Sequence, residues 1–233
     1  MKLFDNNYKK FVFILNMVLL SALIAMDVVY ILYGGLTFKS ITSSIFLLIG
    51  LINLSLSIYQ KVELKFPIIM AVGLLFAMLG DILLEIQFIV GAGLFAIGHI
   101  FFFVSYMFTN KFSWKDLICG AIIFIPSMLF IVLAPIFNFD VVMETVCVVY
   151  ALIISFMVGK AISNFIRKRN ILNLIIMIGS IMFFLSDLML LLSNFASIAV
   201  TGILCLAFYY PAEFMLAFSI FIYADKNDQN FDR

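Results

Sequence analysis

Two aspartates, Asp81 and Asp187, lie inside apolar runs that are long enough to cross a lipid bilayer. Asp81 interrupts the segment LLFAMLGDILLE, and Asp187 interrupts the segment IMFFLSDLMLLL. A lone carboxylate in hydrocarbon costs several kcal/mol, so we expect each side chain to face a polar cavity or a partner. Paired carboxyl groups can deliver a proton and activate water. These aspartates are therefore the first candidates for catalysis.

The composition places these carboxylates in a membrane protein. Of the 233 residues, 66% are hydrophobic and 12% are charged, and the mean hydropathy is +1.23. These values exclude an ordinary soluble domain. We expect an all-α, polytopic integral membrane helix bundle that forms a single transmembrane domain over residues 1–233, because a span needs about 20 apolar residues and eight segments approach this length. The expected spans are 11–33, 41–59, 66–84, 88–108, 117–137, 141–157, 171–192 and 198–223.

The distribution of basic residues supports eight spans independently of hydropathy. Thirteen of the fourteen Lys and Arg residues fall in the two terminal segments or in the second, fourth and sixth connections, and only Lys39 falls elsewhere. Cytoplasmic segments of membrane proteins carry an excess of Lys and Arg. We therefore expect a multi-pass protein of a bacterial inner (cytoplasmic) membrane with both termini in the cytoplasm. The first span continues through Asp27, so we expect it to be retained rather than cleaved as a signal peptide.

The charge distribution, the cysteine spacing and the single histidine argue against nucleic acid, a metal ion and a cofactor as partners. The net charge of +1 and the scattered basic residues provide no continuous face for nucleic acid. The three cysteines lie in different spans without CxxC spacing, so we expect apolar packing roles for Cys119, Cys147 and Cys205. A catalytic zinc ion normally takes three protein ligands, often several histidines, and this chain has one. We expect no metal and no cofactor.

The segments around the two aspartates resemble each other. When they are aligned 106 residues apart, Gly73 falls on Gly179 and LGD at 79–81 falls on LSD at 185–187. The match indicates either a weak parallel repeat or a coincidence in a leucine-rich background. In both cases the small residues leave a smooth stripe for close helix packing. Each aspartate is therefore expected beside a helix interface.

Depth can be estimated from the helical rise of 1.5 Å per residue. Asp81 and Asp187 both lie about 22 Å from the cytoplasmic edge, and His99 and Tyr209 lie about 16 Å from the outer edge. His99 is the only histidine. It is either a hydrogen-bonded packing residue or a participant in the chemistry of the two aspartates.

Beside His99, four polar residues are candidates for supporting roles: Tyr209, Tyr210, Glu213 and Asp27. Glu213 shares one face of the last span with Tyr209 and Tyr210 by i+3 and i+4 spacing. Asp27 lies in the outer third of the first span. We favour an Asp27 carboxylate that extends outward to the membrane–water interface. The alternative is a direct role of Asp27 in catalysis. Glu85 lies near a span end, where we expect solvation.

Two longer segments carry recognisable motifs. Residues 74–108 contain a GD-x-L-L core, followed by F-x-x-G and G-H, and residues 179–217 contain FFLSDLMLLLSNF and YYPAEFMLA. In this order and spacing they resemble the signatures of the YhhN family of eight-span proteins, whose eukaryotic members are lysoplasmalogenases. The resemblance covers about a third of the chain.

The resemblance implies an enzyme, a membrane-embedded hydrolase whose substrate is a lysophospholipid. Such an enzyme cleaves the vinyl ether bond of a lysoplasmalogen to a fatty aldehyde and a glycerophospho-alcohol. By position, the two signature aspartates of the family correspond to Asp81 and Asp187, its histidine to His99, and its tyrosine pair to Tyr209 and Tyr210.

The chain departs from the family pattern at two positions. Phe102 stands where the family often has Tyr, and Glu213 stands where it often has Gln. If those polar groups orient the substrate in relatives, the headgroup preference here differs. The sequence leaves the headgroup and the oligomeric state open.

Vinyl ether hydrolysis independently suits two carboxyl groups. A proton must reach the β-carbon, which produces an oxocarbenium ion; water then attacks, and the hemiacetal collapses. One carboxylic acid supplies the proton while a neighbouring carboxylate stabilises the cation and activates water, as in glycosidases. Burial and mutual repulsion help to keep a proton on one member of such a pair. The sequence does not assign the two roles.

Two other classes of protein use intramembrane carboxylates. A proton-coupled transporter for a small molecule or lipid is the main alternative, because carriers also combine such residues with repeats. In a purely structural bundle, the aspartates would be hydrogen-bonded links between helices. A hydrolase releases aldehyde in detergent, whereas a transporter moves an unchanged substrate across a vesicle membrane.

Overall fold

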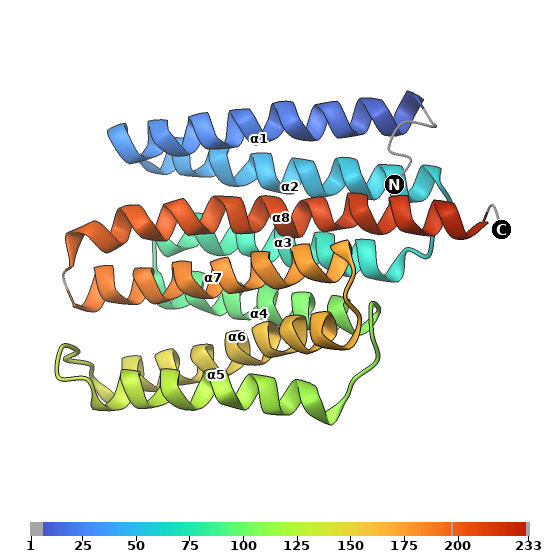
Figure 1. The fold of residues 1–233 in the computed structure, drawn as a ribbon. Helices are drawn as coiled ribbons and strands as arrows, with labels where there is room; N and C mark the ends of the chain where they lie inside the picture. The colour runs from blue at the N-terminus through green and yellow to red at the C-terminus, as the bar shows by residue number, and fades with distance from the viewer. Residues whose placement is uncertain (1–6, 197, 232–233) are drawn as a thin grey trace.

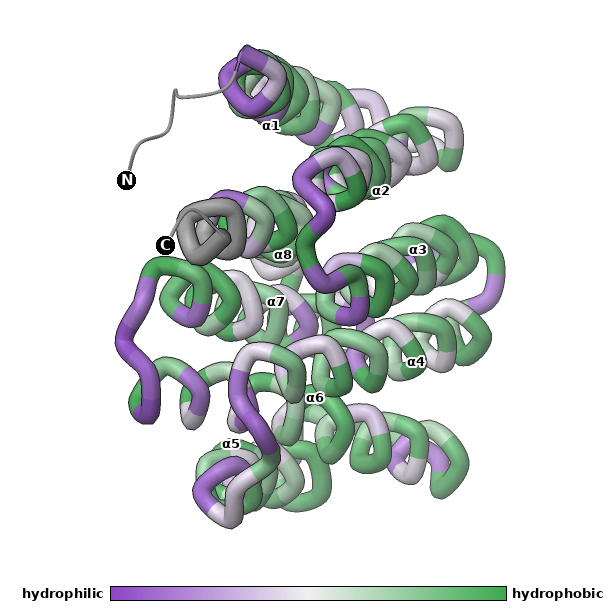
Figure 2. The backbone as a smooth tube through the Cα atoms, turned by 90° about the vertical axis from the view of Figure 1, so that its right-hand side faces the viewer, coloured by the Kyte–Doolittle hydropathy of each residue, from purple (hydrophilic) through white to green (hydrophobic). Residues whose placement is uncertain are grey.

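The computed structural model describes residues 7–196 and 198–231, which form eight helices and no strand (Figure 1). All eight helices are long and apolar enough to cross a membrane, so the prediction of an all-α, multi-pass membrane protein is confirmed. Polar residues gather mostly at the helix ends and connections (Figure 2). The helices are α1 (Asn7–Tyr33), α2 (Leu36–Tyr59), α3 (Lys65–Leu84), α4 (Phe88–Met107), α5 (Trp114–Leu133), α6 (Val141–Arg167), α7 (Ile171–Phe195) and α8 (Ala199–Phe231).

The bundle is elongated in cross-section, with α1 at one edge and α5 at the other (Figure 2). Helix α8 is central, because it contacts α1, α2, α3 and α7. Helix α5 is peripheral, because within the described chain it packs only on α6. Helices α5 and α6 also diverge from α4 and α7 toward the end opposite the termini (Figure 1). Side chains on α8 can therefore reach groups on several helices, whereas α5 borders the bilayer.

The turn between α1 and α2 is shorter than expected. Gly34 and Gly35 adopt φ values of 65° and 94°, a left-handed conformation that glycine adopts without a steric cost. The chain therefore reverses within two residues, and α2 begins five residues before the expected position. Lys39, which we expected in a connection, consequently lies in the first turn of α2.

Helix α6 is longer than expected and continues ten residues past position 157. The charged Lys160 suggested an end there, but its side chain is fully buried. Its ammonium group lies 2.8 Å from Asp116 Oδ2 and 2.9 Å from the Asn110 carbonyl oxygen. An ion pair with additional hydrogen bonds is the usual way to keep a charge inside a protein, so the helix continues through this residue.

The small residues near the two aspartates lie at helix interfaces, as the sequence predicted. A Cβ atom at Gly80 would lie 3.1 Å from the Gly91 carbonyl oxygen, so α3 and α4 are in close contact there. A Cβ atom at Gly179 would lie 3.3 Å from the Ala212 carbonyl oxygen, between α7 and α8. Close approach through small residues is a common mode of membrane helix packing. Each aspartate therefore belongs to a tightly packed helix pair.

We expect the two ends of the bundle to face opposite sides of the membrane, with the termini in the cytoplasm. Helix α1 begins and α8 ends at the same end of the bundle (Figure 1), and the segments rich in Lys and Arg lie there. A reporter fused to the C-terminus should give a cytoplasmic signal, and one inserted near Asn138 should give an external signal. A reporter in the α2–α3 connection serves as a control and should agree with the C-terminal fusion. Signals from the same side at the C-terminus and near Asn138 would contradict eight spans.

Candidate functional site

Asp81 lies near the end of α3 and is only 4% exposed. Its Oδ2 atom accepts a hydrogen bond from the Tyr210 hydroxyl at 3.2 Å and contacts the Ser43 hydroxyl. The Lys39 ammonium lies 3.2 Å from Oδ1. The single hydroxyl proton of Ser43 can go either to Asp81 or to the Lys39 carbonyl oxygen, which is 2.9 Å away. The Ser43 contact is therefore compatible with both the ionised and the protonated carboxyl group.

The Lys39 side chain connects two carboxylates. Its ammonium also lies 3.1 Å from Glu85 Oε1, which accepts a hydrogen bond from the Tyr30 hydroxyl. The Lys39 residue is 5% exposed, whereas the Glu85 side chain is 41% exposed. The expectation of a solvated Glu85 is therefore correct only in part. This cluster joins α1, α2 and α3, and it gives the buried Asp81 a counter-charge.

Asp187 lies on α7 and has a different set of partners. Its Oδ2 atom accepts a hydrogen bond from the Tyr150 hydroxyl at 2.6 Å. The Tyr150 oxygen lies 2.8 Å from His99 Nε2, which is itself 3.4 Å from Asp187 Oδ2. Because Tyr150 donates its one hydroxyl proton in the hydrogen bond to Asp187, its oxygen can accept a hydrogen bond from an Nε2–H group. The buried Nδ1 atom has no hydrogen-bond partner among the described residues.

The two aspartates line one cavity of about 370 Å³. This polar cavity is partly open and reaches residues near the α1–α2, α3–α4 and α7–α8 connections, at the end of the bundle opposite the termini. Its volume falls within the range of small-molecule sites. The polar groups that share its lining with the aspartates are Tyr30, Lys39, Glu85, Ser186, Asn194, Cys205 and Tyr209.

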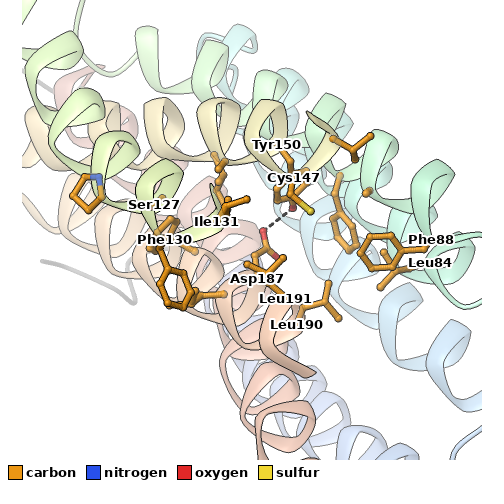
Figure 3. A pocket seen from close by; sticks show the side chains of 18 residues that line it. Leu84, Phe88, Ser127, Phe130, Ile131, Cys147, Tyr150, Asp187, Leu190 and Leu191 are labelled. Carbon is orange, nitrogen blue, oxygen red and sulfur yellow. Dashed lines mark hydrogen bonds between the residues drawn. The ribbon is translucent and has the colours of Figure 1, made fainter. Parts of the chain in front are cut away.

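A second cavity of about 320 Å³ shares Asp187 with the lining of the polar cavity. It lies between α4, α5, α6 and α7, with Leu84 at the end of α3 (Figure 3). Asp187 is the only charged residue in its described lining. Phe88 and Phe95 border both cavities. Asp187 thus has a polar space on one side and an apolar space on the other.

The tyrosine pair and the glutamate of α8 occupy distinct positions. Tyr210 bonds to Asp81, and Tyr209 lines the polar cavity. Glu213 is fully buried, and neither of its carboxylate oxygens has a hydrogen-bond partner among the described residues. Glu213 lines neither of the two cavities. The structure thus brings both tyrosines to the polar site and leaves Glu213 within the packed interior.

The expectation of an outward carboxylate at Asp27 is wrong. The residue is only 8% exposed, and its Oδ1 atom has no hydrogen-bond partner among the described residues. The physical reason is the rotation of α1, which packs on α2 and α8 and turns this face inward.

Sequence reasoning missed three residues that contact the two aspartates directly, namely Lys39, Ser43 and Tyr150. Lys39 carried a signal, because it is the one basic residue outside the cytoplasmic set, and Ser43 follows it by one helical turn. Tyr150 carried no signal, since a tyrosine in an apolar span is unremarkable by itself. Its role is visible only from its contacts with Asp187 and His99.

Comparison with known proteins identifies the family. The model of the YhhN family matches residues 36–220, which include both aspartates, His99 and the tyrosine pair. The chain therefore belongs to the YhhN family. Asp27, on α1, lies outside the matched range. No curated protein and no solved structure matches the chain.

We expect Lys39→Met to lower the free energy of unfolding by about 3–5 kcal/mol, because it leaves Asp81 without its buried counter-charge. Adding Asp81→Asn should restore part of the loss. Thermal unfolding of the purified protein in detergent measures both effects. The control is Lys65→Met, because Lys65 pairs with Glu63 at 3.3 Å on the surface, and loss of an exposed pair should cost less than about 1 kcal/mol. Equal stability of the two lysine variants would refute a charged Lys39–Asp81 pair.

Proposed function

We propose that this YhhN family protein is a membrane-embedded hydrolase that cleaves the vinyl ether bond of a lysoplasmalogen. The products are a fatty aldehyde and a glycerophospho-alcohol. One observation carries the proposal: Asp81 and Asp187, from helices far apart in the sequence, line the same cavity within the membrane-spanning bundle. Two carboxyl groups with different surroundings suit a reaction that needs both an acid and a base. With the termini in the cytoplasm, this cavity would lie in the outer half of the bilayer.

The surroundings favour Asp187 as the acid. A vinyl ether joins a hydrocarbon chain to a polar glycerol, so this bond fits the junction of the two cavities, where Asp187 lies. Tyr150 engages only Oδ2 of Asp187, which leaves Oδ1 for the proton. Asp187 would transfer this proton to the β-carbon of the C=C bond. The adjacent carbon then becomes part of an oxocarbenium ion.

Asp81 suits the role of base on the polar side. Its partners Lys39, Ser43 and Tyr210 all present hydrogen-bond donors to it. A water molecule would attack the oxocarbenium carbon and give its proton to Asp81, which forms the hemiacetal. Collapse returns the hemiacetal hydroxyl proton to Asp187, while Asp81 protonates the departing glycerol oxygen. The carbon–oxygen bond breaks, the aldehyde forms, and both carboxyl groups regain their starting states.

We expect Asp81→Asn and Asp187→Asn each to lower turnover by about 10²–10⁴-fold or more. Asparagine keeps the size and hydrogen bonding of the side chain but cannot transfer the proton. Aldehyde release by purified protein measures turnover, and gel filtration checks the fold. Asp140→Asn is the matched control, because Asp140 is an exposed helix cap and asparagine caps helices equally well. If both Asp81→Asn and Asp187→Asn retained most of the activity, the two-aspartate hypothesis would be refuted.

We also expect the protein to cleave a vinyl ether lysolipid and to spare its saturated alkyl ether and ester analogues. Protonation at carbon needs the electron-rich double bond. Ester hydrolysis usually needs an activated nucleophile, and among the described residues His99 is hydrogen-bonded to Tyr150 rather than to a Ser or Cys. Turnover should slow in D₂O, because proton transfer to carbon limits the rate at least in part.

Lipid mass spectrometry of the three incubations reads out this selectivity. Comparable ester cleavage would indicate a general lipase instead. Intact lipid that accumulates inside proteoliposomes without aldehyde would favour the proton-coupled transporter.

A further inference from the structure

We infer that the apolar cavity between α4, α5, α6 and α7 binds the single hydrocarbon chain of a lysolipid, and that the chain enters it from the bilayer beside α5. The inference rests on the proposed function and specifies how the substrate lies in that site. Four features of the described residues support it: the lining, the lining residues shared with the polar cavity, the position of Asp187 and the packing of α5.

The lining of the cavity suits a hydrocarbon chain. One face of α6 enters it through Val146, Cys147, Tyr150, Ala151 and Ile154, which follow helical spacing. The Tyr150 hydroxyl is directed to Asp187 rather than left unpaired (Figure 3). A hydrocarbon chain that moves from water or lipid into this cavity would not disrupt a hydrogen bond of the lining residues. The volume of about 320 Å³ is typical of a ligand pocket.

The two cavities that border Asp187 differ in polarity, and this difference determines how a ligand would be oriented. The apolar cavity lies on one side, and on the other side Lys39 and Glu85 line the polar cavity. A molecule with one apolar chain and one charged head fills both spaces. A purely polar solute would leave the apolar space empty, and a simple hydrocarbon would leave the charged groups without a ligand. The bond between chain and head then lies beside Asp187.

The packing of α5 provides a route from the bilayer. Residues 126–131 of α5 and 184–191 of α7 contribute to opposite walls of the cavity, yet within the described chain α5 contacts only α6. Between α5 and α7 the backbones are therefore not in close contact, and the two helices share only side-chain packing, in the apolar cluster that contains Ile131 and Leu191. Pro126, which lines the cavity, also interrupts the hydrogen-bond ladder of α5. A chain in the surrounding lipid can reach the cavity between α5 and α7 without the whole lipid leaving the membrane.

The test uses a saturated alkyl-ether lysophosphocholine with a photoreactive diazirine at the end of its chain. The proposed mechanism does not cleave this probe, so labelling does not depend on hydrolysis. After irradiation of the detergent-solubilised protein, peptide mass spectrometry should place adducts in residues 126–131 and 146–154. An excess of the same lysolipid without the diazirine should suppress them. Adducts confined to α1 and α2, or adducts that the competitor does not suppress, would overturn the inference.

Ala151→Phe should lower about tenfold the labelling that the competitor suppresses, because the larger side chain occupies space that the hydrocarbon chain needs. Ala92→Leu fills space in the same cavity from α4 and serves as a second variant if Ala151→Phe does not fold. Ala25→Phe is the matched control, because Ala25 is exposed on α1 and lines neither cavity. Unchanged labelling in the folded cavity variants would overturn the inference.

The two proposals fail separately. Suppose that the probe labels residues 126–131 and 146–154, that the competitor suppresses this labelling, and that the protein releases no aldehyde from a vinyl ether lysolipid. This result would refute the hydrolase and support the site for the hydrocarbon chain. Aldehyde release without such labelling would refute the chain site and leave the hydrolase standing.

Discussion

The pairing of Lys39 with Asp81 is the interaction on which the rest of the site depends. A buried carboxylate without a counter-charge is strongly destabilising in a membrane-spanning bundle, and Lys39 is the basic residue in contact with Asp81. The two-glycine turn between α1 and α2 starts α2 early enough to place Lys39 at that depth. The same ammonium also contacts Glu85. A short turn in the backbone thus makes a charged cavity compatible with a hydrophobic bundle.

The two aspartates look equivalent in the sequence, but their surroundings differ. Asp81 has an ammonium group and two hydroxyl groups as partners. Asp187 has Tyr150 and, behind it, the His99 ring. Enzymes that use two carboxyl groups separate their roles by such differences in environment. The weak resemblance between the segments around them therefore does not imply that the two residues perform the same chemical step.

The sequence predicted the helices well because long apolar runs have few alternatives in a membrane protein. It predicted less about the partners of each side chain, because nearly all residues of such helices are apolar and no polar stripe reveals how a helix is rotated. Asp27 and Tyr150 illustrate this, since their inward orientation depends on which neighbours α1 and α6 pack against. Lys160 shows a related difficulty, because only its distant partner Asp116 explains why α6 continues. The cavities leave no local pattern in the sequence at all.

The divergence of α5 and α6 from α4 and α7 gives the site its asymmetry (Figure 1). Tight packing there would close the apolar cavity and leave Asp187 facing only the polar one. With both cavities present, water has access from the side of Lys39 and Glu85, while the opposite side is lined almost entirely by apolar groups. An oxocarbenium ion formed at Asp187 would therefore meet water from one direction, the direction in which Asp81 lies. In the proposed reaction, the separation of the acid from the attacking water would follow from the packing of the helices, because in a uniformly packed bundle Asp187 would border only one cavity.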